Sequence, residues 1–104
     1  MSETMAALLQ LQNMDSKLAN GEVEATAYRL RKRKEVVRAI PANAARDYDR
    51  LRSRHSNAIV PVVDNTCMGC FVQLPSAVSS RLGNGRDVVC CDHCGRILYI
   101  PDQE

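Results

Sequence analysis

Two short stretches, CMGC at residues 67–70 and CDHC at residues 91–94, decide how the second half of this 104-residue chain folds. Each stretch places two cysteines three positions apart, so both sulfurs can lie on one tight turn and bind the same ion. Twenty residues separate the two pairs, a spacing close to that of known zinc sites. The pattern therefore predicts one tetrahedral Zn²⁺ ion with four thiolate ligands, Cys67, Cys70, Cys91 and Cys94.

A fifth cysteine, Cys90, stands directly before the second pair. Adjacent residues of a strand point to opposite faces, so Cys90 faces away if Cys91 faces the metal. Gly69 and Gly95 favour the same choice of ligands, because glycine permits the positive φ and the close backbone approach that such turns need. We expect Cys90 to be a small packed residue, and a redox-sensitive thiol near the site is the alternative.

Four thiolates fill a zinc coordination shell, whereas a catalytic zinc keeps one position open for water. No catalytic triad, phosphate-binding glycine loop or carboxylate pair accompanies the cysteines, so we expect a structural metal and no enzymatic activity. An iron site of the rubredoxin type is the alternative, but its usual aromatic enclosure is nearly absent in a chain with one Phe and no Trp. Arg96 is either a neighbour that neutralises the thiolates or a solvated strand residue, and His93 is expected to be exposed.

The sequence predicts an α+β fold in which a helical half precedes a ribbon. Ser2 is the expected first N-cap, Asn20-Gly21 is a natural helix stop, and Pro41 suits a first helical turn. One continuous helix through Gly21 is the alternative. The predicted parts are an N-terminal antiparallel helical hairpin or short coiled coil over residues 1–57, with helices at about 3–19, 22–39 and 41–56, and a small β zinc ribbon over residues 58–104.

The second half contains short β-branched runs. AIVPVV at residues 58–63 includes Pro61, which favours an edge strand. PSAVSSRL at residues 75–82 predicts a short helix, and GNG at residues 83–85 predicts a turn. DVVCC and RILYI predict strands on either side of the second cysteine pair.

The N-terminal sequence MSETMAALLQLQ has no basic start and its apolar run is interrupted by glutamines, which argues against a signal peptide. No apolar stretch approaches the ~20 residues that a membrane-spanning helix needs. We therefore expect a cytoplasmic protein without membrane contact, in which the thiols stay reduced.

Three stretches resemble one known family. YDRLRSRHSNAIVPVVDNTCMGCFVQLP at residues 48–75 carries a Tyr-x-x-Leu-Arg helix end, a Val-rich strand, Cys-x-Gly-Cys and Leu-Pro. CDHCGRILYI at residues 91–100 carries Cys-x-x-Cys-Gly-Arg-Ile-Leu-Tyr, and LLQLQNMDSKL at residues 8–18 looks like the start of the same family. Together they resemble the bacterial C4-type zinc ribbon family, with an unusually short helical part.

The resemblance implies a coiled-coil-like helical hairpin that carries a zinc ribbon, with Cys67, Cys70, Cys91 and Cys94 as the ligands. Members of this family are regarded as nucleic-acid-binding or regulatory adaptor proteins. Some relatives are associated with RNA and with alternative sigma factors of transcription.

Basic residues concentrate between Arg29 and Arg54, where ten Lys/Arg and three acidic residues give a local net charge of +7 in a chain whose total is +2. Like charges four apart on a helix repel one another, and phosphates would relieve that repulsion. A merely solvated surface is the alternative. We predict weakly sequence-specific binding to the backbone of RNA or DNA, and the candidate residues are Arg29, Arg31, Lys32, Arg33, Lys34, Arg38, Arg46, Arg50 and Arg54.

A protein partner is the second hypothesis. The apolar stripes of the short helices, or the strand edge of the ribbon, could dock a protein of the transcription machinery such as a sigma factor. Because short helices are marginally stable alone, a homodimer is also plausible.

Overall fold

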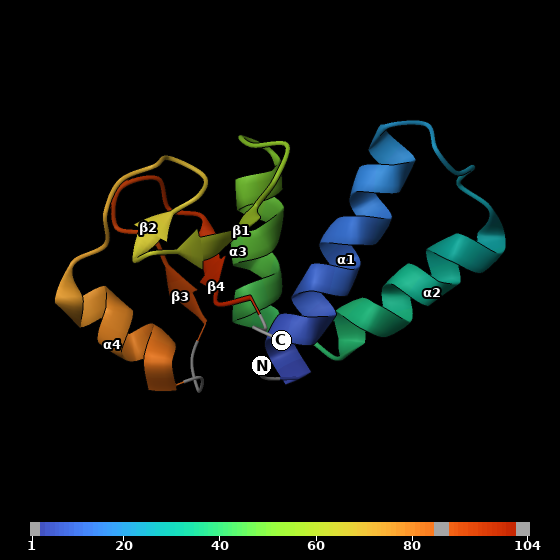
Figure 1. Ribbon diagram of the computed structural model, residues 1–104. Helices are drawn as coiled ribbons and strands as arrows, with labels where there is room; N and C mark the ends of the chain where they lie inside the picture. The colour runs from blue at the N-terminus through green and yellow to red at the C-terminus, as the bar shows by residue number, and fades with distance from the viewer. Residues whose placement is uncertain (1–2, 85–87, 102–104) are drawn as a thin grey trace.

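The computed structural model describes residues 3–84 and 88–101, and within them it contains four helices and one four-stranded sheet. Figure 1 shows α1 and α2 at one end of the molecule, the sheet and α4 at the other, and α3 between them. This arrangement confirms the predicted α+β class. The elements are α1 (Glu3–Ala19), α2 (Ala27–Arg38), α3 (Ala42–Arg52), β1 (Ile59–Val63), β2 (Thr66–Cys67), α4 (Ser76–Asn84), β3 (Val89–Cys90) and β4 (Ile97–Tyr99).

The first helix stops where the sequence predicts a stop. Gly21 has a φ of +73°, and its N–H donates to the Leu18 carbonyl at 3.3 Å while the Glu22 N–H donates to the Lys17 carbonyl at 2.9 Å. These two bonds form a Schellman motif, which satisfies carbonyls at the helix end. A continuous helix through Gly21 is therefore excluded, and α1 and α2 form an antiparallel hairpin (Figure 1).

The second helix begins at Ala27, later than the predicted start at about residue 22. Thr26 is its N-cap, with extended backbone and a side-chain oxygen that accepts the Arg29 N–H at 3.2 Å. A threonine cap of this kind supplies an acceptor that the first turn otherwise lacks. The apolar spacing that includes Val23 extends before the cap, so spacing alone placed the helix start too early.

The third helix ends at Arg52 rather than near residue 56. The Ser53 hydroxyl donates to the Arg50 carbonyl at 2.6 Å, and the His55 N–H donates to the Leu51 carbonyl at 2.8 Å. These bonds close the last turn and lead the chain towards β1. The start of α3, with Pro41 as its N-cap, lies close to the prediction, whereas the predicted N-cap Ser2 lies outside the described residues.

The sheet has the strand order β2-β1-β4-β3, in which β1 is parallel to β4 and the other pairs are antiparallel. The prediction that Pro61 marks an edge strand is wrong, because β1 lies inside the sheet. Its residues pair with β4 from Ile59 to Pro61 and with β2 at Val62 and Val63. Pro61 thus falls where one ladder ends and the other begins, so its missing N–H disrupts neither ladder.

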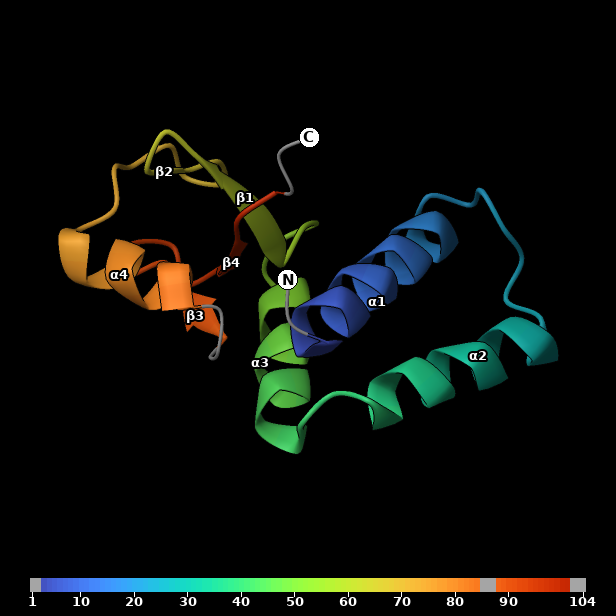
Figure 2. The ribbon, with the colours of Figure 1, turned by 60° about the horizontal axis from the view of Figure 1, so that its bottom comes forward.

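The helix expected at PSAVSSRL is present as α4, and Figure 2 shows it on the side of the sheet away from α1 and α2. Gly83 belongs to α4, so the helix continues into the segment where the sequence predicts a turn. The rest of that predicted turn, at Gly85, lies outside the described residues.

Two clusters of apolar side chains hold these elements together. The larger one contains buried residues from the helices and the ribbon, including Leu8, Leu11, Tyr48, Ile59 and Ile97. The boundary predicted between residues 57 and 58 therefore separates two parts that share one core. None of the helices within residues 3–84 and 88–101 has the length and apolar character needed to cross a membrane.

Candidate metal centre

The smaller cluster lies within the ribbon and includes the cysteines. The sulfurs of Cys67, Cys70, Cys91 and Cys94 all lie within 4.8 Å of one another. Contacts across the two pairs are 3.8 Å between Cys67 and Cys94, and 3.7 Å between Cys70 and Cys91. A tetrahedral zinc with Zn–S bonds of about 2.3 Å requires sulfurs about 3.8 Å apart. The four thiol groups therefore fit one structural Zn²⁺ ion.

The two turns that carry the ligands have the same backbone pattern. The Phe71 N–H donates to the Cys67 carbonyl at 2.7 Å, and the Gly95 N–H donates to the Cys91 carbonyl at 3.0 Å. The residue after the second cysteine has positive φ in both turns, +62° at Phe71 and +80° at Gly95. The prediction of positive φ at Gly95 is confirmed. In the first turn the left-handed residue is Phe71, and Gly69 is not among the positive-φ glycines of the described residues.

Gly69 is instead required for close approach. A Cβ atom at this position would lie 2.8 Å from both Cδ and Nη1 of Arg96. The Arg96 side chain also donates from Nε to the Asn57 carbonyl at 3.1 Å, which fixes its course across the first turn. Arg96 thus brings a positive charge beside the cysteine cluster, as the first of its two sequence interpretations expects.

The thiols differ in how readily they lose a proton. Burial raises the pKa of the Cys67 thiol above its ordinary value. Burial acts in the same direction at Cys94, but the Arg96 backbone N–H, the neighbouring thiols and the Arg96 side chain outweigh it, so the pKa of Cys94 is lowered. Thiolates are the zinc ligands, so the groups around Cys94 favour the form of the thiol that binds the metal.

Cys90 and His93 lie near the cluster but outside the four-sulfur group. Cys90 is half-buried and packs against the larger core, and burial raises the pKa of its thiol. His93 is exposed, and its backbone N–H donates to the Cys91 sulfur at 3.4 Å. Cys90 is thus packed and outside the ligand set, as strand alternation predicts, and His93 is exposed, as the spacing of the ligands predicts.

The candidate nucleic-acid residues lie in the helical half of the chain. Arg33 differs from the rest because its guanidinium donates to both carboxylate oxygens of Asp15, at 2.7 and 3.1 Å. Lys32 and Arg50 form exposed ion pairs with Glu35 and Asp47. The candidates with exposed side chains are Arg29, Arg31, Lys32, Lys34 and Arg38 on α2, Arg46 and Arg50 on α3, and Arg54 just after it.

Sequence reasoning did not single out two further residues. Phe71 is 70% exposed. The sequence feature that could have pointed to it is its position directly after Cys70, which matches that of Gly95 directly after Cys94. Arg52 lines a cavity between α1 and α3 and carried no signal of its own, because its neighbours Arg50 and Arg54 share the same charge.

Comparison with known proteins supports the geometry. Residues 66–98 match the family described as the C4-type zinc ribbon domain. Two solved structures are similar: CT398 from Chlamydia trachomatis, with 25% identity and a TM-score of 0.62, and the HP0958 protein from Helicobacter pylori CCUG 17874, with 26% identity and a TM-score of 0.64. The similar regions cover 71% and 73% of this chain but 32% of each of those chains. No curated protein matches the sequence.

The family match spans the four ligand cysteines, β2, α4, β3 and most of β4. It contains every member of the smaller cluster except Val60 and Val62. The sulfur geometry and the match together identify residues 66–98 as a C4-type zinc ribbon domain that binds one structural zinc ion through Cys67, Cys70, Cys91 and Cys94.

Proposed function

We propose that this chain is a non-enzymatic, regulatory zinc-ribbon protein of the cytoplasm that binds the backbone of RNA or DNA through α2 and α3. The observation that carries the proposal is the exposure of α2, because none of its residues is buried and five of them are exposed Lys or Arg. Most of its basic side chains can thus meet a partner, while Arg33 is held by Asp15. The zinc holds the ribbon, which in turn supports the basic helices through the shared core.

The charge arrangement favours phosphate as the partner group. Among the described residues, Arg31, Lys34, Arg38, Arg46 and Arg54 form no ion pair. Basic side chains without acidic partners attract phosphates and release the counterions condensed on them. Because the exposed aromatic on α2 is Tyr28 alone, contacts to the backbone rather than base stacking should dominate.

A salt titration of RNA and DNA binding, measured by fluorescence anisotropy, tests the proposal. Affinity should fall as salt rises, with a logarithmic slope of about −0.7 per neutralised phosphate for single strands. Replacing Arg31 and Lys34 together by glutamine should weaken binding and reduce the magnitude of that slope. Replacing Arg81 on α4 removes one charge outside the basic helices and is the control. No binding at low salt, or binding that salt does not weaken, would overturn the proposal.

A protein adaptor of the transcription machinery is the second candidate. The first cysteine turn and its strands expose apolar side chains, Val63, Met68, Phe71 and Val72. An exposed aromatic near other exposed apolar side chains is typical of protein interfaces. Affinity purification from the native cell with nuclease treatment separates the candidates. A partner that resists nuclease and is lost on Phe71→Ala supports the adaptor, and a partner that nuclease removes supports nucleic-acid binding.

A further inference from the structure

A cavity of about 520 Å³ lies between the end of α1 and the segment that joins α3 to β1. Its lining comes from Ser16, Ala19 and Asn20 on one side and from residues 52–56 on the other. Within the described part of the chain, no acidic residue belongs to this lining. The lining is mostly polar and carries the positive charges of Arg52 and Arg54. Asp15, the residue before Ser16, lies near enough to Arg52 to interact with its charge.

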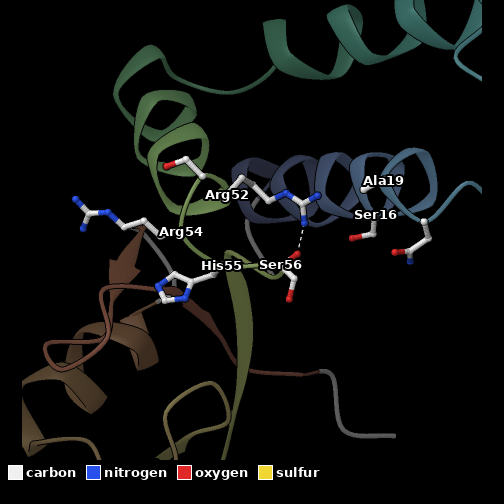
Figure 3. Close-up of a pocket in the computed structure, with 8 residues that line it drawn as sticks. Ser16, Ala19, Arg52, Arg54, His55 and Ser56 are labelled. Atoms are coloured by element: carbon white, nitrogen blue, oxygen red, sulfur yellow. Dashed lines mark hydrogen bonds between the residues drawn. The ribbon is translucent and has the colours of Figure 1, made fainter.

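Figure 3 shows how the cationic side chains lie. Arg52 extends from α3 towards Ser16 and Ala19 on α1, and its guanidinium donates to the Ser56 carbonyl. Arg54 and His55 point away from Arg52. Arg52 is therefore the cation that crosses the cavity, and the Ser56 carbonyl fixes its direction.

Several carbonyls at the two helix ends already have donors. The Asn20 N–H donates to the Ser16 carbonyl at 2.9 Å, and the Leu51 carbonyl accepts from the Arg54 and His55 N–H groups at 3.1 and 2.8 Å. The Ser53 hydroxyl donates to the Arg50 carbonyl. These bonds reduce the repulsion that the C-terminal end of a helix exerts on an anion.

The cavity lining offers more hydrogen-bond donors than the protein itself uses. A guanidinium has five N–H groups, and among the described residues Arg52 uses one nitrogen for the Ser56 carbonyl. Within the same residues, the hydroxyls of Ser16 and Ser56 and the side-chain amide of Asn20 form no hydrogen bond with the protein. A ligand that satisfies these groups must offer several acceptor oxygens and negative charge.

We infer that this cavity binds a phosphate group of a nucleic-acid strand, with Arg52 as the main ligand and Ser16, Asn20 and Ser56 as further donors. The planar guanidinium fork matches two phosphate oxygens, and the hydroxyls and the amide of the same lining offer donors for the others. The inference deepens the proposed function and rests on it, because it names one phosphate position at the edge of the basic helices. It also assigns a role to Arg52, which stands between the exposed Arg50 of α3 and the exposed Arg54 just after that helix.

The test is a pair of ¹H–¹⁵N NMR titrations of the full zinc-bound chain, one with inorganic phosphate and one with a single-stranded RNA oligonucleotide. Both ligands should shift the amide signals of Ser16, Asn20 and residues 52–56. Arg52→Gln should lower the affinity for inorganic phosphate about tenfold, as expected for lost hydrogen bonds to a charged group. Arg52→Lys keeps the positive charge but lacks the planar guanidinium fork, so its affinity for inorganic phosphate should lie between that of Arg52→Gln and that of the natural chain. Arg81→Gln removes a charge on α4 and should change nothing at the cavity.

The two arms separate this inference from the proposed function. RNA binding that shifts α2 but leaves the cavity signals unmoved, and that Arg52→Gln does not weaken, overturns the inference while the proposed function stands. Inorganic phosphate binding at the cavity without any RNA binding overturns the proposed function and, with it, the assignment of the cavity to a nucleic-acid strand. Equal phosphate affinity for Arg52→Gln and the natural chain, with both folded by the same NMR spectra, overturns the site.

Discussion

The side-chain amide of Gln12 pairs with both backbone polar groups of Ile59. Nε2 of Gln12 donates to the Ile59 carbonyl at 2.9 Å, and the Ile59 N–H donates to Oε1 of Gln12 at 2.7 Å. The amide thus takes the place of a neighbouring strand at the start of β1. Because Ile59 also pairs with Ile97 of β4, this contact joins α1 to the middle of the ribbon sheet.

Replacing Gln12 by Ala should lower the free energy of unfolding by about 2 kcal/mol, since it leaves the N–H and the carbonyl of Ile59 without partners. Gln10→Ala, on an exposed position of the same helix, is the matched control and should change stability little. Urea unfolding followed by circular dichroism measures both. Equal midpoints for the two variants would contradict a role for the Gln12 amide.

Acid should destabilise the helical part through Asp15. Burial acts to raise the pKa of this carboxyl, but hydrogen bonds from Arg33 and Tyr48 and the charge of Arg33 outweigh it, so the pKa lies below 3.8. A lowered folded-state pKa gives stability that is complete above the unfolded pKa and is lost as pH falls from about 5 through the folded pKa. Asp15→Asn should therefore flatten the fall in stability over this range.

At pH 7 the same Asp15→Asn variant should be less stable by about 1.5–3 kcal/mol, the usual worth of hydrogen bonds to a charged group. Asp49→Asn, an exposed carboxylate on α3, is the control and should keep the natural acid profile. Urea midpoints between pH 3 and pH 7 measure the effect. An unchanged pH slope in Asp15→Asn would show that other groups cause the acid sensitivity.

Removal of zinc should unfold the ribbon and also weaken the helices. Structural zinc contributes about 10–16 kcal/mol of apparent binding free energy in small domains at neutral pH. Loss of the ribbon withdraws Ile59 and Ile97 from the core that buries Leu8 and Tyr48. Chelation should therefore make residues 58–101 protease-sensitive and lower the melting temperature of the helical signal. Unchanged circular dichroism and proteolysis after verified metal removal would contradict a structural zinc.

Gly69→Ala should lower the stability of the protein, whereas Gly83→Ala should raise it. At Gly69 the new methyl group would lie 2.8 Å from Arg96, so that side chain must shift and its bond to Asn57 must weaken. At Gly83, within α4, a methyl group meets nothing within 4 Å and should stabilise the helix by up to about 1 kcal/mol. Thermal unfolding and the rate of zinc transfer to a chromogenic chelator measure both. Faster zinc release in Gly83→Ala than in Gly69→Ala would contradict the role of Arg96.

Phe71→Gly should leave the protein equally stable or stabilise it by about 1 kcal/mol, because glycine adopts a φ of +62° without the cost that a side chain incurs. The ring is 70% exposed, so its removal loses little burial. Ser80→Gly, at an exposed position of the neighbouring helix α4, should destabilise by a comparable amount and is the contrasting control. A strong loss of stability in Phe71→Gly would mean that the ring packs against the ribbon.

Local chemistry made some features predictable. The ligand set follows from two Cys-x-x-Cys turns, since each pair fits one ion without reference to the rest of the fold. The stop at Gly21 follows from the left-handed conformation that glycine accepts. The exclusion of Cys90 from the ligands follows from strand alternation, because its neighbour Cys91 must face the metal.

Other features depend on partners distant in the chain. Whether β1 lies at an edge is decided by β4, which pairs with it from almost forty residues away. The pairing of Arg33 with Asp15 and the hydrogen bond of Tyr48 to the same carboxylate require α1, α2 and α3 to meet at one point. Spacing along a single helix carries no information about either contact.

The sequence by itself therefore determined the metal, its four ligands and the order of the four helices and of β1, β3 and β4, but not β2, because short-range geometry is enough for each of the former. Only the tertiary structure decided which basic residues are free for a partner and which are held. Arg33 is committed to Asp15, and Arg52 crosses a cavity towards Ser16, although both stand in the same positive run as their exposed neighbours. Charge is a property of the residue, whereas its direction and partners are set by the packing of three helices and a sheet.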